Sequence, residues 1–217
     1  GQSFGASEVS LNQDVALTFA NALNSNVYDN AFYLRGSHTR LIADNHVVVL
    51  NGDITIELPV PDERASSYFE TVVGGDSGAG LTINGAINAF GPADLVATAA
   101  ETTRITFNGT INETPGAPVN FFGFGTGTKA LMADNLHTGS TFVNQGVLLV
   151  GNSDLTAGSA TGFGTVLLRS TSGGNERTRL EGQGRLAGDT TAEGVVIAPY
   201  QDGGSNFGSL VFGGDLS

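Results

Sequence analysis

The chain has 217 residues, of which 32 are glycine and none is cysteine, and its net charge is −12. The lack of cysteine excludes disulfide bridges, zinc sites built on thiolates and cysteine nucleophiles. Nucleic acid and anionic membrane surfaces are disfavoured as partners, because both require clustered cations and the chain has a single lysine, Lys129. No apolar run approaches the roughly 18 residues of a transmembrane helix, so membrane insertion is not expected.

Composition also indicates the fold class. Glycine, asparagine and threonine are abundant and lysine and glutamate are scarce, which depletes the chain of helix formers. A single all-β domain spanning 1–217 is therefore expected, since β domains of this length are common.

The N-terminal segment 1–46 has its own pattern. Its apolar residues alternate at Val9, Leu11, Val15, Leu17 and Phe19. The part from 15 to 23 reads equally as a strand or as a helix capped by Asp14. We expect 1–46 to be a capping or donated segment and 47–217 to form the coils of a solenoid.

A short pattern recurs along those coils. Two apolar residues in alternation precede Asn-Gly or Gly-Gly and then Ile or Leu, at 48–54, 81–87, 105–111 and 210–216. Asn-Gly supplies the positive φ that turns the backbone, and the run after each turn is short. A corner between two strands therefore suits the pattern better than a hairpin. The spacing of 33 and then 24 residues fits one or two solenoid coils.

Between these copies the sequence is less regular. Residues 58–77 and 112–124 read as excursions from the core, and 92–97 could form one or two helical turns. Phe121, Phe122 and Phe124 are either core residues or an exposed patch, and the core is favoured. Short strands separated by Gly, Asn, Ser or Asp continue from 140 to 217, which is typical of a solenoid, sandwich or barrel.

Residues 125–152 carry a more specific pattern, formed by Gly125, Gly127, Thr128, Leu131, Asn135, Thr138, Gly139, Thr141, Val143, Gly146, Leu148 and Val150. This pattern resembles the autotransporter-associated β-strand repeat of secreted bacterial surface proteins. The segments 180–188, 197–199 and 208–216 resemble the coils that follow such repeats. The resemblance implies a right-handed parallel β-helix with irregular loop excursions and few or no helices.

Residues that could carry chemistry do not form a recognisable set. His38, His46 and His137 lack metal-ligand spacing, so we expect them at solvated or corner positions and predict no metal site and no cofactor. Glycoside cleavage needs two carboxylates on one surface, and the candidates in the sequence are Asp14, Asp29, Asp53, Glu57, Asp62 and Glu63. Nothing in their spacing pairs two of them. We predict no catalytic residues and keep a polysaccharide lyase or hydrolase as the minority alternative.

The two ends of the sequence suggest how the protein works. The last residues, 210–216, form a regular strand and turn without a following cap, and the N-terminal alternation has no lysine to block pairing. We expect a secreted structural protein whose end coils pair head to tail with copies of itself in a filament or surface layer. The expected interface residues are Val9, Leu11, Val15, Leu17, Phe19, Leu210, Phe212 and Leu216. The alternative is an adhesin that binds glycans or host surfaces.

Overall fold

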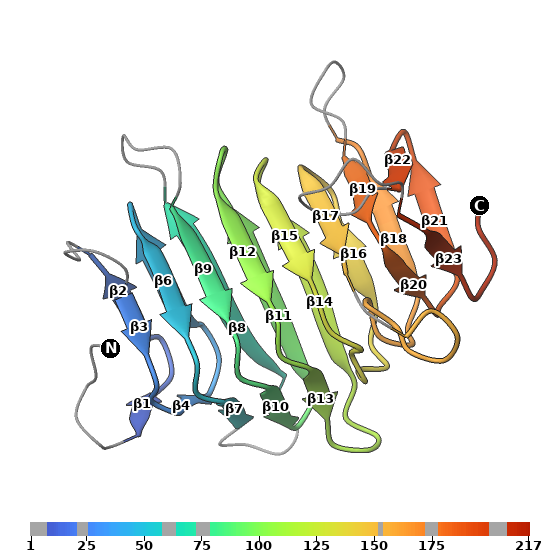
Figure 1. The fold of residues 1–217 in the computed structure, drawn as a ribbon. Coiled ribbons are helices and arrows are strands. Elements are labelled where there is room, and N and C mark those ends of the chain that lie inside the picture. The colour runs from blue at the N-terminus through green and yellow to red at the C-terminus, as the bar shows by residue number, and fades with distance from the viewer. Residues whose placement is uncertain are drawn as a thin grey trace.

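The computed structural model describes residues 8–20, 26–57, 64–72, 79–151, 154–171, 178–199 and 208–217. These residues form a right-handed parallel β-solenoid of about seven turns, with the first described coil and the last at opposite ends of the axis (Figure 1). Every strand is short and every pairing between strands is parallel. Within the described part of the chain there is no helix, and so none that could cross a membrane.

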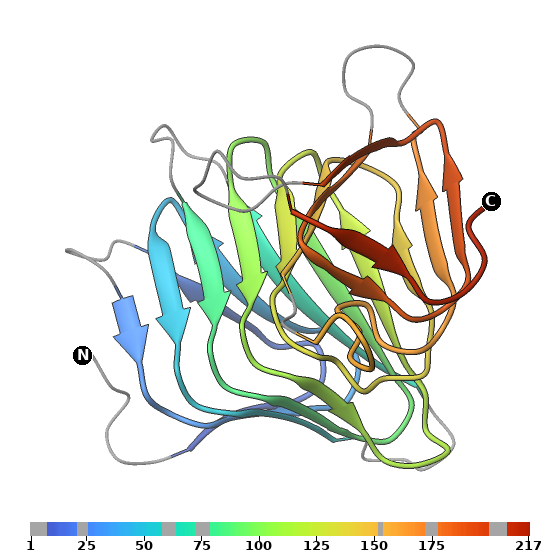
Figure 2. The ribbon, with the colours of Figure 1, turned by 45° about the vertical axis from the view of Figure 1, so that its right-hand side comes forward.

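Each of the first five coils places one strand in each of three sheets, which form the sides of the solenoid, and the later coils continue two of them (Figure 2). Sheet A contains β1 (Val9–Leu11), β4 (Phe32–Arg35), β7 (Ile54–Glu57), β10 (Ile87–Phe90) and β13 (Ile111–Glu113). Sheet B contains β2 (Ala16–Phe19), β5 (Thr39–Asp44), β8 (Ala65–Val72), β11 (Ala93–Ala99), β14 (Val119–Phe124), β16 (Thr141–Val143), β18 (Val166–Arg169) and β21 (Thr190–Glu193). Sheet C contains β3 (Asn26–Tyr28), β6 (Val47–Leu50), β9 (Gly80–Ile83), β12 (Arg104–Phe107), β15 (Thr128–Leu131), β17 (Val147–Val150), β19 (Arg179–Gly182) and β22 (Val196–Pro199). A fourth sheet pairs β20 (Gly184–Leu186) with β23 (Leu210–Phe212).

The core consists of rows of apolar side chains that run along the axis. Successive strands pair in register, so the inward residue of one coil lies on that of the next. In sheet A, Phe32, Ile54, Ile87 and Ile111 are register partners and each is at most 1% exposed. Burial of such a side chain contributes roughly 1.5–3 kcal/mol, and the rows repeat this gain in each coil.

The sequence repeat forms the corner between sheets C and A. Leu50, Ile83 and Phe107 are register partners, and the Asn-Gly pair that follows each of them turns the chain into the next strand of sheet A. A Cβ atom on Gly52, Gly85 or Gly109 would lie within 2.2 Å of a backbone oxygen of the preceding coil. The predicted corner is confirmed for the first three copies. The expected positive φ is wrong for them, because Gly52, Gly85 and Gly109 do not have it, and glycine is required there by the close approach of the preceding coil. The copy at 210–216 is different, because β23 lies in the fourth sheet and Leu216 then bridges to Thr190 in sheet B.

The structure decides between strand and helix for the stretch from 15 to 23 and overturns several other local expectations. The stretch from 15 to 23 forms the strand β2 rather than a helix over its described residues, and 92–97 lies mostly in the strand β11. Residues 64–72 and 112–124, expected as excursions, carry the regular strands β8, β13 and β14. Residues 58–63 and 73–77 lie outside the described part. Tertiary pairing decides these segments, because alternation with a period of two is satisfied only when both neighbouring coils are present.

The three phenylalanines of β14 differ in burial. Phe121 points inward, is fully buried and packs edge to face on Phe107 with ring centroids 5.6 Å apart. Phe122 and Phe124 are only half-buried and lie on the outer face of sheet B. The predicted core position therefore holds for Phe121 alone, since neighbouring residues of a strand point to opposite faces.

The described residues of 1–46 are part of the solenoid. The strands β1, β2 and β3 form its first coil and pair with β4, β5 and β6 of the next. The architecture therefore does not change at residue 47.

Candidate functional site

The eight residues predicted to form an assembly interface lie in two groups at opposite ends of the solenoid. Val9, Leu11, Val15, Leu17 and Phe19 belong to the first coil. Leu210, Phe212 and Leu216 belong to the last (Figure 1). Those in strands point inward, because their register partners are core residues: Leu11 lies on Leu34, and Phe212 lies on Leu186.

The two ends differ in how well their interior is covered. In the first coil, Leu11 and Phe19 are 7% and 4% exposed, although Val15 is 40% exposed. In the last coil, Ile197 and Leu216 are 38% and 49% exposed, while their register partners Leu180 and Thr190 are almost fully buried. The interior of the last described coil is therefore partly open to solvent.

The outer face of sheet B carries a second group of conspicuous residues, of which the sequence singled out only Phe122. Tyr68, Val96, Phe122, Phe142 and Leu167 follow one another in register along the axis and are called the apolar row here. Phe122 packs against Phe142 with ring centroids 6.3 Å apart, and Phe124 stacks beside Phe122 at the same distance. This part of the sheet is apolar although it faces away from the core.

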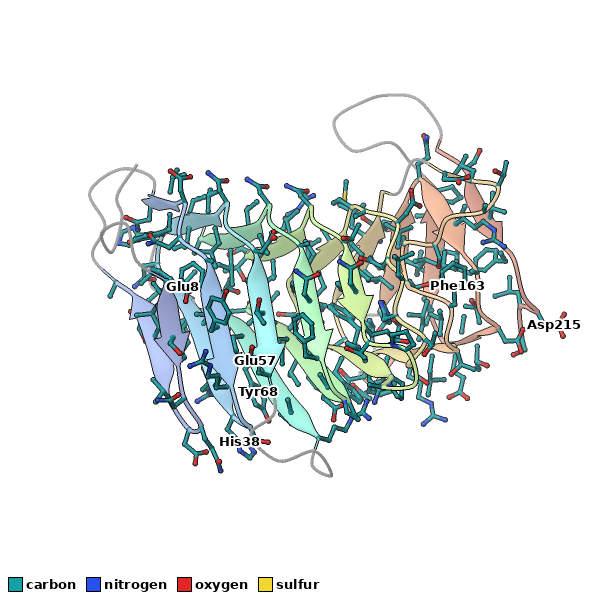
Figure 3. The ribbon with its side chains drawn as sticks, turned by 90° about the horizontal axis from the view of Figure 1, so that it is seen from below. Glu8, His38, Glu57, Tyr68, Phe163 and Asp215 are labelled. Atoms are coloured by element: carbon teal, nitrogen blue, oxygen red, sulfur yellow. The ribbon has the colours of Figure 1, made fainter. Side chains whose placement is uncertain are left out.

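A shallow hollow of about 430 Å³ lies at the start of the apolar row, lined by Asp14, His38, Arg40 and Tyr68. His38 Nδ1 lies 3.4 Å from Asp14 Oδ1, and its ring stacks on Tyr68 with centroids 6.1 Å apart (Figure 3). The guanidinium carbon of Arg40 lies over the ring of Tyr68, 5.6 Å from its centroid. The same guanidinium pairs with the carboxylate of Glu70 at 2.7 Å. Asp14 and His38 both have φ near +60°, which marks successive corners of the solenoid rather than isolated strain.

A line of polar side chains runs beside the apolar row, two residues earlier in each strand or the loop before it. Its members, called the polar row, are Asp94, Asn120, Ser140 and Thr165. Asn120 donates to Asp94 over 2.9 Å and accepts from the backbone N–H of Ser140 over 2.9 Å. The hydroxyls of Ser140 and Thr165 are 2.9 Å apart. These contacts align the polar groups of four successive coils.

The single lysine is inside the core. Lys129 is register partner to Ile105 and Leu148 and is fully buried. Its ammonium donates to the carbonyl oxygens of Gly125, Gly127 and Gln145 at 2.7, 3.0 and 2.6 Å. Burial lowers the pKa of Lys129 to about 7. The side chain of Lys129 joins two successive corners. The sequence offered one indication of this burial, since the lysine occupies a position of the repeat that is otherwise apolar.

A polar cluster replaces sheet A after β13. The buried amide of Asn135 accepts from Ile111 N–H over 2.8 Å and donates to Ala160 over 2.6 Å, so one side chain spans the gap between coils. His137 is also fully buried, and desolvation lowers its pKa to about 4 against an opposing effect of Glu113. The expectation of a solvated or corner position is therefore wrong for His137.

The described acidic candidates for glycoside cleavage each contact a different partner. Asp14 lies by His38, Asp29 accepts from Asn51, and Glu57 pairs with Arg35. Asp53 accepts from the backbone of Ala86, and Asp62 and Glu63 lie outside the described residues. Among the residues that the structure describes, no three His, Asp or Glu side chains form a group that could hold a metal ion.

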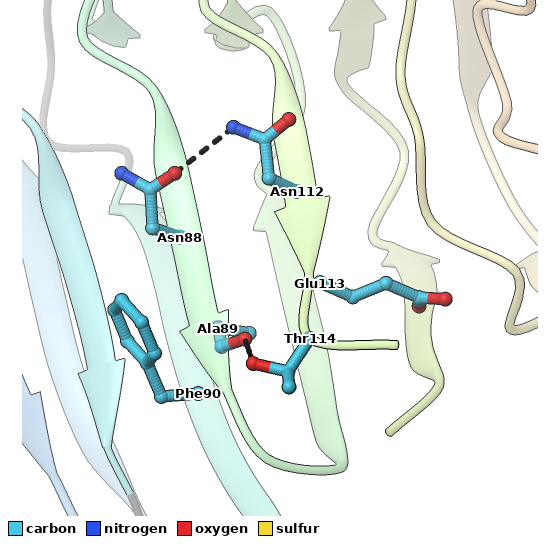
Figure 4. Close-up of a pocket in the computed structure, with 6 residues that line it drawn as sticks. All are labelled: Asn88, Ala89, Phe90, Asn112, Glu113 and Thr114. Carbon is cyan, nitrogen blue, oxygen red and sulfur yellow. Dashed lines mark hydrogen bonds between the residues drawn. The ribbon is translucent and has the colours of Figure 1, made fainter. Parts of the chain in front are cut away.

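A small second hollow of about 100 Å³ lies on the outer face of sheet A (Figure 4). Asn112 donates to Asn88 over 2.9 Å above it, and Thr114 donates to the backbone of Ala89 below it. Its volume is too small for more than a few water molecules.

Comparison with known proteins gives no relative: no protein-family model, curated protein or solved structure matches this chain. The resemblance of residues 125–152 to the autotransporter-associated repeat therefore stays a prediction. The β-solenoid architecture stands on the strand pairing alone.

Proposed function

We propose that the chain is a structural subunit that assembles head to tail with copies of itself into an extracellular filament or surface layer. The observation that carries the proposal is the partly open interior of the last described coil. Ile197 and Leu216 point inward there and remain 38% and 49% exposed. A further coil stacked on this end would bury them as Leu180 is buried in the coil before.

The first coil of a second copy has the right order of elements to supply that coil. Its strands β1, β2 and β3 occur in the sequence sheet A, sheet B, sheet C. The last coil presents β23 of the fourth sheet, the bridge of Leu216 to sheet B, and β22 of sheet C. Stacking β1 on β23 and β3 on β22 would continue two parallel ladders, and strand edges of this kind pair readily with other chains.

The geometry of such a contact sets the form of the assembly. The two surfaces are different ends of the subunit, so the contact is heterologous, and stacking along one axis does not close a ring. Repetition of the contact gives an open filament whose axis follows the solenoid axis. The lack of cysteine does not exclude a secreted location, and the acidic net charge opposes non-specific association.

Negative-stain electron microscopy of the purified chain, combined with sedimentation velocity at rising micromolar concentrations, tests the proposal. We expect unbranched filaments whose length increases with concentration. Monodisperse monomers across the whole range would overturn the proposed assembly and leave the fold untouched.

A further inference from the structure

The outer face of sheet B combines features that the end-to-end contact does not use. The apolar row spans five successive coils, from Tyr68 in β8 to Leu167 in β18. Neighbouring strands are about 4.8 Å apart. The rings of Phe122 and Phe142, on neighbouring strands, have centroids 6.3 Å apart along this row. Side chains packed in this way present ring faces and edges that are already ordered before any ligand arrives.

Hydrogen-bonding groups accompany the row on one flank. The polar row offers a carboxylate, a carboxamide and two hydroxyls from four successive coils, at Asp94, Asn120, Ser140 and Thr165. Carboxylates and amides have more donor or acceptor sites than these mutual contacts use. A ligand lying on the apolar row could therefore make one polar contact per coil.

The charges on this face cancel locally. Arg40 pairs with Glu70 at 2.7 Å, Arg64 pairs with Asp94, and Arg169 pairs with Glu193 at 2.9 Å. The chain as a whole carries −12, which repels anions. The strip therefore suits an uncharged ligand with one apolar and one hydroxylated side.

We propose that the outer face of sheet B binds an extended, uncharged polysaccharide that runs along the solenoid axis. The apolar faces of successive pyranose rings pack on Phe122, Phe142 and their neighbours in the apolar row. Their hydroxyls bond to the polar row. The strand spacing is close to the length that one sugar unit adds to an extended chain, so one unit matches one coil. The hollow at Asp14, His38, Arg40 and Tyr68 receives the unit at one end.

A polypeptide is a poorer occupant of the same face. Each strand of sheet B between β2 and β21 is paired on both sides, so no strand edge is open here to bond a peptide backbone. Face-to-face packing of two copies would press the ion pairs that flank the apolar row against each other. Removing these charged groups from water would cost free energy and oppose the contact. A narrow strip edged by hydrogen-bonding groups matches a single sugar chain better.

Affinity electrophoresis through gels containing hydroxyethylcellulose, arabinoxylan, galactomannan or dextran tests the proposal, with polygalacturonate as the charged control. We expect retardation by at least one neutral polysaccharide and none by polygalacturonate. Titration with oligosaccharides of that polymer should show affinity rising with length until the row is filled. No retardation by any neutral polymer overturns the proposal, as does retardation by polygalacturonate alone.

Variants locate the site. Phe122→Leu keeps an apolar side chain but removes the ring, and we expect it to weaken binding about tenfold, the scale of one aromatic contact. Phe90→Leu is the matched control, because Phe90 lies exposed on sheet A, and it should bind as the wild type does. Equal loss in both variants, or no loss in Phe122→Leu, would overturn the assignment of the face. If the wild type forms dimers and Phe142→Ala abolishes them, the occupant of this face is a second copy of the chain instead. The variant Leu216→Lys, which alters the proposed filament contact, should bind the polysaccharide as the wild type does. The binding proposal and the filament proposal are therefore tested independently.

Discussion

Asn84 donates a hydrogen bond of 2.7 Å to the amide oxygen of Asn51, which occupies the same corner of the solenoid one coil earlier. Asn108 in turn donates to Asn84 over 2.8 Å, and Asn51 donates to Asp29 over 2.7 Å. Four successive corners are thereby joined in one ladder. The sequence repeat thus fixes the turn, through glycine, and also the contact between turns, through asparagine.

Asn84 is at the centre of that ladder, so its replacement removes two hydrogen bonds. We expect Asn84→Ala to lower the free energy of unfolding by about 1–2 kcal/mol, since each exposed bond contributes a modest net amount. Urea unfolding followed by circular dichroism measures the change. Asn88→Ala removes one comparable bond, to Asn112, and should cost about half as much. Equal costs for the two variants would contradict the ladder's role.

Gly85 has no room for a side chain. A Cβ atom there would lie 2.2 Å from the carbonyl oxygen of Gly52, and backbone cannot yield as a flexible side chain can. We expect Gly85→Ala to cost about 3 kcal/mol through overpacking, measured by thermal or urea unfolding. Gly116→Ala is the control: its φ is +82° and no atom lies within 4 Å, so only the conformational cost of about 1 kcal/mol applies. A larger loss for Gly116→Ala than for Gly85→Ala would contradict the conclusion that contact between coils excludes a side chain at Gly85.

Lys129 should make stability depend on pH above neutrality. Its folded-state pKa is lowered to about 7 from the model-peptide value of 10.5, so between these values the unfolded chain holds a proton that the folded chain has lost. Stability therefore rises with pH from about 7 towards 10, by at most about 1.4 kcal/mol per pH unit, and is independent of this group below pH 7. The difference in unfolding free energy between wild type and Lys129→Met isolates the effect, because other groups cancel. A constant difference from pH 6 to pH 9 would contradict it.

Lys129→Met should also destabilise the protein at pH 6. It leaves the carbonyls of Gly125, Gly127 and Gln145 without the ammonium that bonds to them. We expect a loss of about 2–3 kcal/mol, on the scale of unpaired buried polar groups. Urea unfolding at pH 6 measures it.

Leu216→Lys places a charge on the open end of the last coil. We expect filaments to disappear, since the incoming coil would bury an unpaired ammonium, while unfolding free energy changes by less than about 0.5 kcal/mol. Leu136→Lys is the matched control, because Leu136 is 55% exposed but lies on the side of the solenoid rather than at its end. Filaments that persist in Leu216→Lys, or vanish in both variants, would contradict the proposed contact.

The head-to-tail geometry gives this variant a further property. Its first coil is intact, so it should add to the open last coil of a wild-type filament and stop growth there. Substoichiometric Leu216→Lys should therefore shorten wild-type filaments in electron micrographs. Unchanged lengths would indicate a symmetrical contact between like ends instead.

The sequence by itself determined the all-β class and the corners at Asn51, Asn84 and Asn108, while the parallel β-helix was expected only from the resemblance of residues 125–152 to a known repeat. These features are local: strand alternation and Asn-Gly turns recur often enough to be recognised without contacts between coils. Only the tertiary structure decided which face each residue takes. Whether Phe121 or Phe122 lies inside depends on register with the coils on either side, and a shift of one residue would exchange them. The burial of Lys129 and the alignment of Phe122 with Phe142 likewise arise between coils, where residues about 20 positions apart become neighbours. The sequence thus specified the repeating backbone, and stacking of the coils created the surfaces on which the proposed assembly and binding depend.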